Sequence, residues 1–158
     1  MEQEIKDYIN QLPELNKLNY EIITCQKGHE GIPEIKDNKM GIYIYAYKGK
    51  YLKIGKAWTN SSARWIYQHY NYNSSKSNLA SSIINDKDFC KENNLKKVTK
   101  DNKEDREYIR TWLKTNTQRI NIIIERSNNS KRDLFYLNLM ESWLHYKCNP
   151  KYEGHKYN

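Results

Sequence analysis

Hydrophobic and polar residues alternate on both sides of a short turn between residues 41 and 57, and this pattern predicts a β-hairpin. Gly49, between two lysines, supplies the backbone freedom that the turn needs. Because successive strand side chains point to opposite faces, the alternation divides the hairpin into two rows. The first row is aliphatic and is expected to face a core: Ile42, Ile44, Ala46, Leu52 and Ile54. The second row consists of phenols and an ammonium group, suited to phosphates and bases: Tyr43, Tyr45, Tyr47, Tyr51 and Lys53. Taken alone, tyrosines that only cover a sheet are the simpler interpretation of this second row.

The remaining chain predicts helices around this hairpin. Apolar residues at helical spacing predict helices at residues 2–19 (interrupted at Pro13), 63–70, 77–86, 104–114 and 130–146. Branched residues predict a strand at 119–125, residues 20–24 are compatible with a short one, and the polar residues 87–103 are expected to form an exposed loop. The sequence therefore predicts an α/β (α+β) fold, with a small three-stranded antiparallel sheet flanked by helices in residues 41–158. Residues 1–40 form an N-terminal helical arm that could pack on the domain, mediate dimerisation or grip a ligand.

Composition narrows the class of partner. A chain of 158 residues and 19.0 kDa fits one domain, and a formal net charge of +8 favours a polyanion. Fourteen tyrosines interleaved with lysine and arginine suit contact with nucleic acid. Three distant cysteines without a Cys-x-x-Cys pair argue against a disulfide framework or a zinc site. Without an apolar run of membrane-spanning length or a signal peptide, we expect a cytoplasmic protein and no membrane partner.

One position in the last predicted helix breaks its pattern. Glu141 occupies the apolar stripe that also contains Leu134, Leu137 and Leu144. An ionised carboxylate in such a place is costly unless it meets a cation or hydrogen-bond donors. From periodicity alone, an internal salt bridge to lysine or arginine is the commoner outcome, and a metal ion at the edge of the core is the other.

Four short elements, taken together, resemble the GIY-YIG nuclease superfamily: Gly41-Ile42-Tyr43, Lys53-Ile54-Gly55, Arg64 and Glu141. The restriction-endonuclease branch and short uncharacterised relatives look closest. The resemblance spans about residues 41 to 154. Further family-like residues are Ser62-Ala63-Arg64-Trp65, Gln68-His69-Tyr70, Arg119-Ile120, Leu139 to Leu144, Asn149-Pro150 and Glu153-Gly154. Lys53 departs from the second tyrosine of the family name, as it does in some restriction nucleases.

The resemblance implies a divalent-metal-dependent endonuclease that hydrolyses DNA, related to restriction or other genome defence. It implies that Tyr43 accepts the proton of the attacking water and that Glu141 holds a single ion. A carboxylate suits Mg²⁺, for which Mn²⁺ can substitute. Lys53 lies on the predicted face of Tyr43, and both it and Arg64 can favour the phenolate. Arg64 can also donate two hydrogen bonds to the scissile phosphate.

Other candidate residues surround these four. His69 follows Arg64 by five residues, about 140° round an ideal helix, so both a catalytic role and packing beside Trp65 are open. Lys56, Tyr45 and Tyr67 are expected to contact DNA.

The expected partner is double-stranded DNA, and cleavage of a palindromic site would call for a homodimer. Single-stranded DNA and RNA stay open as substrates. Two other classes of function compete with the nuclease. One is a nucleic-acid-binding module with the same fold that does not cut, and the other is a structural or protein-interaction domain.

Overall fold

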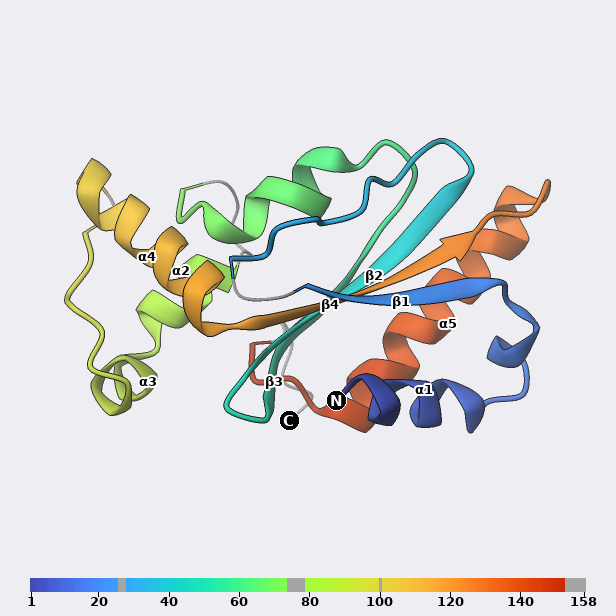
Figure 1. The fold of residues 1–158 in the computed structure, drawn as a ribbon, viewed down its shortest axis with the longest axis horizontal. Coiled ribbons are helices and arrows are strands. Elements are labelled where there is room, and N and C mark those ends of the chain that lie inside the picture. The colour runs from blue at the N-terminus through green and yellow to red at the C-terminus, as the bar shows by residue number, and fades with distance from the viewer. Residues whose placement is uncertain (26–27, 74–78, 100, 153–158) are drawn as a thin grey trace.

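The computed structural model describes residues 1–25, 28–73, 79–99 and 101–152. Within these residues, a four-stranded antiparallel sheet has helices on both faces, in the strand order β1-β4-β2-β3 (Figure 1). The α+β class is therefore confirmed, but the expected number of three strands is wrong, because β1 adds a fourth at the edge of β4. The strands are β1 (Tyr20–Cys25), β2 (Lys39–Tyr47), β3 (Lys50–Ala57) and β4 (Gln118–Glu125).

The helices lie close to where apolar spacing predicts them. They are α1 (Glu2–Asn10), η1 (Leu15–Lys17), η2 (Ala63–Tyr67), η3 (Gln68–Tyr70), α2 (Leu79–Asn85), α3 (Lys87–Glu92), α4 (Lys103–Asn116) and α5 (Ser130–Cys148). The asparagines Asn102 and Asn129 begin α4 and α5, because each side chain accepts a hydrogen bond from a backbone N–H of the first turn. The first residues of the helix predicted at 77–86, and the family-like Glu153 and Gly154, lie outside the described residues.

The β2–β3 hairpin turns at two residues with positive φ, Lys48 (φ 48°) and Gly49 (φ 75°), as a two-residue turn requires. Tyr45 pairs with Lys53 and Ala46 pairs with Tyr51, so Leu52 is an extra residue in β3. Such a bulge changes which face the following residues occupy. The predicted faces of Tyr51 and Leu52 are therefore wrong. Tyr51 packs on the face of Ile42 and Ile44, and Leu52 packs on the face of Tyr43 and Tyr45.

One face of the sheet is covered by α1 and α5 (Figure 1). Its core includes the inward side of α5 and the first row of the hairpin except Leu52. From the predicted N-terminal arm, Ile5, Ile9 and Leu15 are fully buried in the same core. Residues 1–40 thus supply both a helix on this face and the edge strand β1, so they are continuous with the packing of the rest of the chain.

The opposite face of the sheet is also a core, which the sequence did not predict. The segments η2, η3, α2, α3 and α4 cover it, and the rings of Tyr43, Tyr45 and Tyr47 are packed beneath them. Phe89 of α3 contacts the rings of Tyr47 and Trp112. Residues 87–103 are therefore not simply an exposed loop, because Asp86 caps a short helix that carries this buried ring.

Two glycines allow close approach between layers. A Cβ atom at Gly41 would lie 2.9 Å from the Trp65 ring. Gly55 pairs with Tyr43 across the hairpin, and a Cβ atom there would overlap the Tyr43 hydroxyl. The glycine of Lys53-Ile54-Gly55 thus leaves the space through which the phenol of Gly41-Ile42-Tyr43 crosses β3.

No helix in the described part of the chain is both long enough and apolar enough to cross a membrane.

Replacing Gly55 with alanine is expected to destabilise the protein, because the added methyl group would overlap a buried ring. Overpacking of this kind costs about 1–3 kcal/mol, measurable as a lower free energy of unfolding in urea. The control is Lys50→Ala, at an exposed position of the same strand, which should change that free energy by less than about 0.5 kcal/mol. Wild-type stability for Gly55→Ala would contradict the close approach.

Candidate functional site

Tyr43 is the centre of the candidate site. Its side chain is fully buried on the face of the sheet covered by η2 and η3, and its hydroxyl group passes over Gly55 on β3. Because β3 is an edge strand, the hydroxyl group lies near the rim of the sheet. The sequence predicted that Tyr43 belongs to an exposed row of phenols, and this is wrong. Its ring is enclosed, and only its hydroxyl oxygen is directed to this rim.

Arg64 lies on η2 and contacts this hydroxyl group. Its Nε atom donates a hydrogen bond to the Tyr43 Oη atom at 3.4 Å, while the residue as a whole is exposed. A guanidinium group has five N–H donors in a planar fork, a geometry that suits the oxygens of a phosphate. The structure therefore brings together the phenol and the guanidinium group that the sequence places 21 residues apart.

His69 joins the same cluster from η3, the 3-10 helix that follows the π-helix η2. Neither segment has the residue spacing of an ideal α-helix. The sequence argument assumed an α-helix and therefore turned His69 away from Arg64. In the structure, the His69 ring packs on the Tyr43 ring with centroids 4.4 Å apart.

The imidazole of His69 is buried without a hydrogen-bond partner for either ring nitrogen among the described residues. Unpaired buried polar groups are rare, and they often mark a place for water, an ion or a substrate. Burial is the main cause that lowers the pKa of His69 to about 3, and the positive charges of Lys53, Arg119 and Arg64 lower it further. His69 is therefore neutral near pH 7 and able to donate one hydrogen bond and accept another.

Lys53 is buried on the Tyr43 side of the sheet, as predicted, because it pairs with Tyr45 in the hairpin register. Its ammonium group donates to the backbone oxygen of Tyr152 at 3.3 Å. It is also close enough to lower the pKa of His69. The cluster thus combines one phenol, one neutral imidazole and two cationic side chains.

Of the three residues expected to contact DNA, Tyr45 is placed wrongly by the sequence. Its side chain is fully buried, and burial raises the pKa of its hydroxyl well above the ordinary value. This hydroxyl accepts a hydrogen bond from the Arg119 Nη1 atom at 3.0 Å, so it has a role inside the protein. Tyr67, in contrast, is 62% exposed and is available to a ligand.

Arg119 is a central residue to which the sequence analysis gave no role. Its guanidinium group is completely buried and donates to the Trp65 oxygen at 2.6 Å, to the Asn121 Oδ1 atom at 2.8 Å and to two tyrosine hydroxyls. None of these partners is a carboxylate. The guanidinium carbon lies 5.9 Å from the centre of the Tyr43 ring, so a positive charge without a carboxylate partner among the described residues lies beneath the site. Arginine at a strand position, two residues before another polar residue, was the available signal.

Glu141 reaches the rim of the sheet from the other face. It lies on α5 and accepts a hydrogen bond from the Lys56 Nζ atom at 2.5 Å. Lys56 pairs with Ile42, so both charged groups are on the α5 face and not on the Tyr43 face. The internal salt bridge considered for Glu141 is therefore present. The Glu141 carboxylate and the Tyr43 hydroxyl do not meet, because they lie on opposite faces of β3. Lys56, the partner of Glu141, directly follows Gly55, over which the Tyr43 hydroxyl passes.

A metal ion would find limited protein ligation here. Among the described residues, no group of three or more histidine, cysteine, aspartate or glutamate side chains could hold an ion. Glu141 alone offers a carboxylate, which is 18% exposed and already faces a cation, the Lys56 ammonium group. One hard oxygen ligand with access to water suits Mg²⁺, which usually keeps several of its waters.

Comparisons with known proteins do not add a family to this geometry. No family model matches the chain, and no match is found among curated proteins or among solved structures.

Proposed function

We propose that this protein is a divalent-metal-dependent endonuclease that hydrolyses phosphodiester bonds of DNA. The observation that carries the proposal is the contact between the Tyr43 hydroxyl and Arg64, beside an imidazole whose buried nitrogens have no partner among the described residues. A phenol, a guanidinium group and a neutral imidazole are not needed together for packing. They do match the needs of phosphodiester hydrolysis, which are proton removal, charge stabilisation and a hydrogen bond to the reacting groups.

In this mechanism, Tyr43 in its phenolate form accepts a proton from the attacking water. The water oxygen forms a bond to phosphorus, and the bond from phosphorus to the leaving alkoxide breaks. Arg64 donates hydrogen bonds to the non-bridging oxygens, whose negative charge grows in the transition state. The charges of Arg64, Lys53 and Arg119 favour the phenolate, and burial of the ring opposes it. His69, being neutral, positions the water or a phosphate oxygen by hydrogen bonding.

Glu141 would hold the metal ion, together with water and phosphate oxygens. Bound there, Mg²⁺ would neutralise charge on the phosphate and on the leaving oxygen. Lys56 donates to the same carboxylate and would have to leave it before an ion could bind there, which would make its ammonium group available to a phosphate. Lys56 belongs to β3, the edge strand that the Tyr43 side chain crosses from the other face, and Glu141 contacts Lys56 from α5.

A catalytically silent nucleic-acid-binding module is the second candidate. The net charge of +8 supports it equally. The unpaired His69 beside the Tyr43–Arg64 contact favours the enzyme, because a binding module has no need of a buried, unsatisfied imidazole next to a phenol.

Tyr43→Phe, Arg64→Ala and Glu141→Ala are each expected to reduce DNA cleavage below detection, because each removes a different part of the chemistry. The measurement is conversion of supercoiled plasmid in Mg²⁺, with thermal unfolding to establish that each variant is folded. Lys131→Ala, at an exposed position early in α5, is the matched control and should cut like wild type. Substantial cutting by the Glu141 variant would remove that residue from the mechanism.

His69→Gln is expected to lower the rate of cleavage by roughly ten- to a hundredfold, the effect of a lost hydrogen bond to a charged group. The shape of the pH–rate profile between pH 5 and 8 should stay the same, because the pKa of His69, near 3, lies below this range. The test is a comparison of the profiles of wild type and variant. A limb near pH 6.5 that disappears in the variant would show instead that His69 exchanges its proton during turnover.

A further inference from the structure

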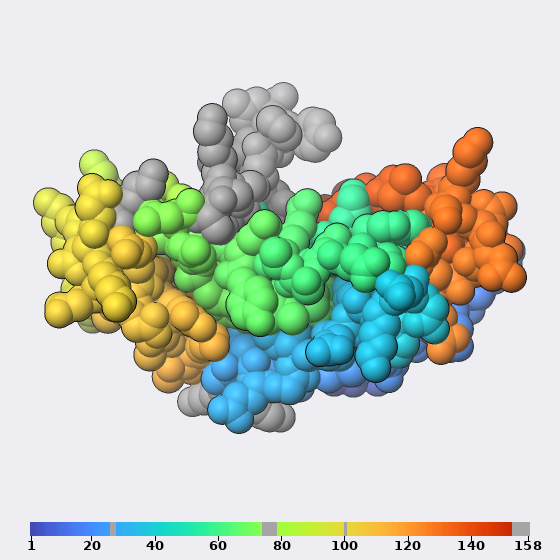
Figure 2. Space-filling view, turned by 90° about the horizontal axis from the view of Figure 1, so that it is seen from above, coloured from blue at the N-terminus to red at the C-terminus, as the bar shows by residue number. Residues whose placement is uncertain are grey.

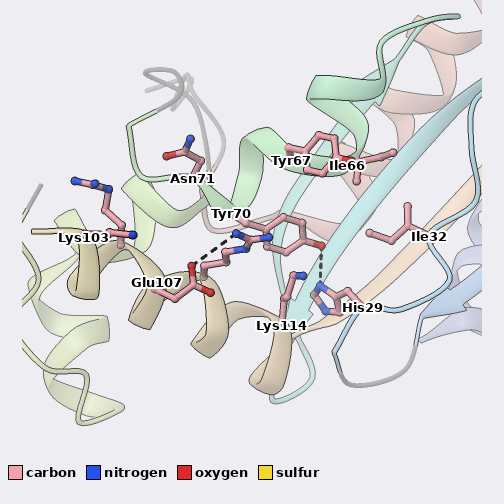
Figure 3. A pocket seen from close by; sticks show the side chains of 11 residues that line it. His29, Ile32, Ile66, Tyr67, Tyr70, Asn71, Lys103, Glu107 and Lys114 are labelled. Carbon is pink, nitrogen blue, oxygen red and sulfur yellow. Dashed lines mark hydrogen bonds and ion pairs between the residues drawn. The ribbon is translucent and has the colours of Figure 1, made fainter.

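A groove with a volume of about 610 Å³ lies beside the segment η2–η3, which carries Arg64 and His69 (Figure 3). One wall is α4, and the other is the segment η2–η3 with Asn71. Figure 2 views the molecule from above, where η2 and η3 (green) lie next to both α4 (yellow to orange) and residues 28–37 (blue). The proposed chemistry at Tyr43 does not use this groove.

The α4 wall is strongly cationic. Lys103, Arg106, Arg110 and Lys114 all line the groove, and their spacing of three, four and four residues places them on one stripe of the helix. The lining contains one carboxylate, Glu107, which pairs with Arg110 at 3.7 Å. His29 adds no charge near pH 7, because burial is the main cause that lowers its pKa to about 4. Four cations against one carboxylate favour an extended polyanion.

The opposite wall offers an aromatic surface. Tyr67 is 62% exposed at the groove and is followed by Asn71, while Ile66 and Ile32 add apolar surface below. An exposed ring beside a row of cations is the combination that binds unpaired nucleic acid, because bases stack on the ring while phosphates meet the charges. In a duplex the faces of the bases are already stacked on each other and are closed to the ring.

The groove and the proposed active site share the segment η2–η3. Tyr67, which lines the groove, and Arg64, which contacts Tyr43, both belong to η2. Tyr70, which also lines the groove, accepts a hydrogen bond from Arg119, and Arg119 donates another to Tyr45 next to Tyr43. A strand whose phosphate met Arg64 would reach α4 by way of Tyr67.

We propose that this groove binds an unpaired nucleic-acid strand that flanks the cleaved bond, with a base stacked on Tyr67 and phosphates on the cationic stripe of α4. The proposal rests on the proposed nuclease function only in stating that the bound strand flanks a cleaved bond. Binding itself can be measured separately from cleavage.

The experiment is fluorescence polarisation with a labelled oligothymidine, and with a duplex of equal length, in EDTA so that no metal-dependent cleavage occurs. Binding is measured for wild type, for the double variant Lys103→Gln/Arg110→Gln and for Tyr67→Ala. Lys131→Gln/Arg132→Gln, on the exposed start of α5, is the control and removes the same number of charges. Thermal unfolding establishes that all three variants are folded.

We expect wild type to bind oligothymidine more tightly than the duplex. The α4 double variant and Tyr67→Ala should each weaken oligothymidine binding by about tenfold, from lost phosphate contacts and lost stacking respectively. The α5 control should stay within about twofold of wild type, since loss of distant charge alone acts weakly when screened by salt.

Equal weakening by the α4 and α5 double variants would overturn the groove as the binding site. Tighter binding of the duplex, with no effect of Tyr67→Ala, would overturn the unpaired strand. If the groove variants lose binding as expected but wild type never cuts DNA, the groove is upheld and the nuclease proposal alone fails. If cleavage requires Tyr43 but neither binding nor cleavage depends on the groove, the groove proposal alone fails.

Discussion

The buried guanidinium group of Arg119 is the interaction on which the candidate site depends. It donates hydrogen bonds to the Trp65 backbone oxygen in η2, to the Tyr70 hydroxyl in η3 and to Tyr45 in β2. Removing a charged group from water costs several kcal/mol, and these hydrogen bonds offset that cost only if the segment keeps its position. Arg119 therefore ties η2 and η3 to the sheet, and with them the side chains of Arg64 and His69 over Tyr43.

The position of β3 at the edge of the sheet is the second constraint. Gly55 leaves space for the Tyr43 hydroxyl to cross this strand from one face, and Lys56, the next residue, extends to Glu141 on the other face. If β3 were an interior strand, a further strand would lie beside it and would block access to groups from its two faces. As an edge strand, β3 leaves its outer side open. The proposed nuclease chemistry thus uses both faces of the sheet, at a rim where a phosphate could meet groups from each of them.

Much of this arrangement could be predicted from the sequence. Alternation in residues 41–57 and helical spacing around Leu137 and Leu144 predict the hairpin and α5, because each pattern is long and regular. Tyr43 and Arg64, two elements of the motif, are in contact, and their action on one phosphate stays a prediction. Lys53 and Lys56 lie on opposite faces of the sheet, as their odd spacing along β3 requires.

The errors have local physical causes. One extra residue, Leu52, changes the alternation in β3, and bulges have no strong sequence signal. The segment with Arg64 and His69 is a π-helix followed by a 3-10 helix, so the spacing of an ideal α-helix does not apply, and the His69 ring packs on the Tyr43 ring. Burial of Tyr45 depends on α2, α3 and α4 covering the second face, which is a tertiary property that strand alternation does not contain. Glu141 lies on its predicted helix. Its partner, Lys56, could not be predicted, because it depends on the register of β3, which places Lys56 on the α5 face.

The most direct test of the account is incubation of the purified wild-type protein with two closed circular DNA molecules, one double-stranded and one single-stranded. The account predicts that Mg²⁺ or Mn²⁺ allows the protein to convert closed circles to nicked or linear products, and that EDTA prevents the conversion. Closed circles that stay intact in both metals, with folded protein that binds them, would contradict the account and leave a binding module.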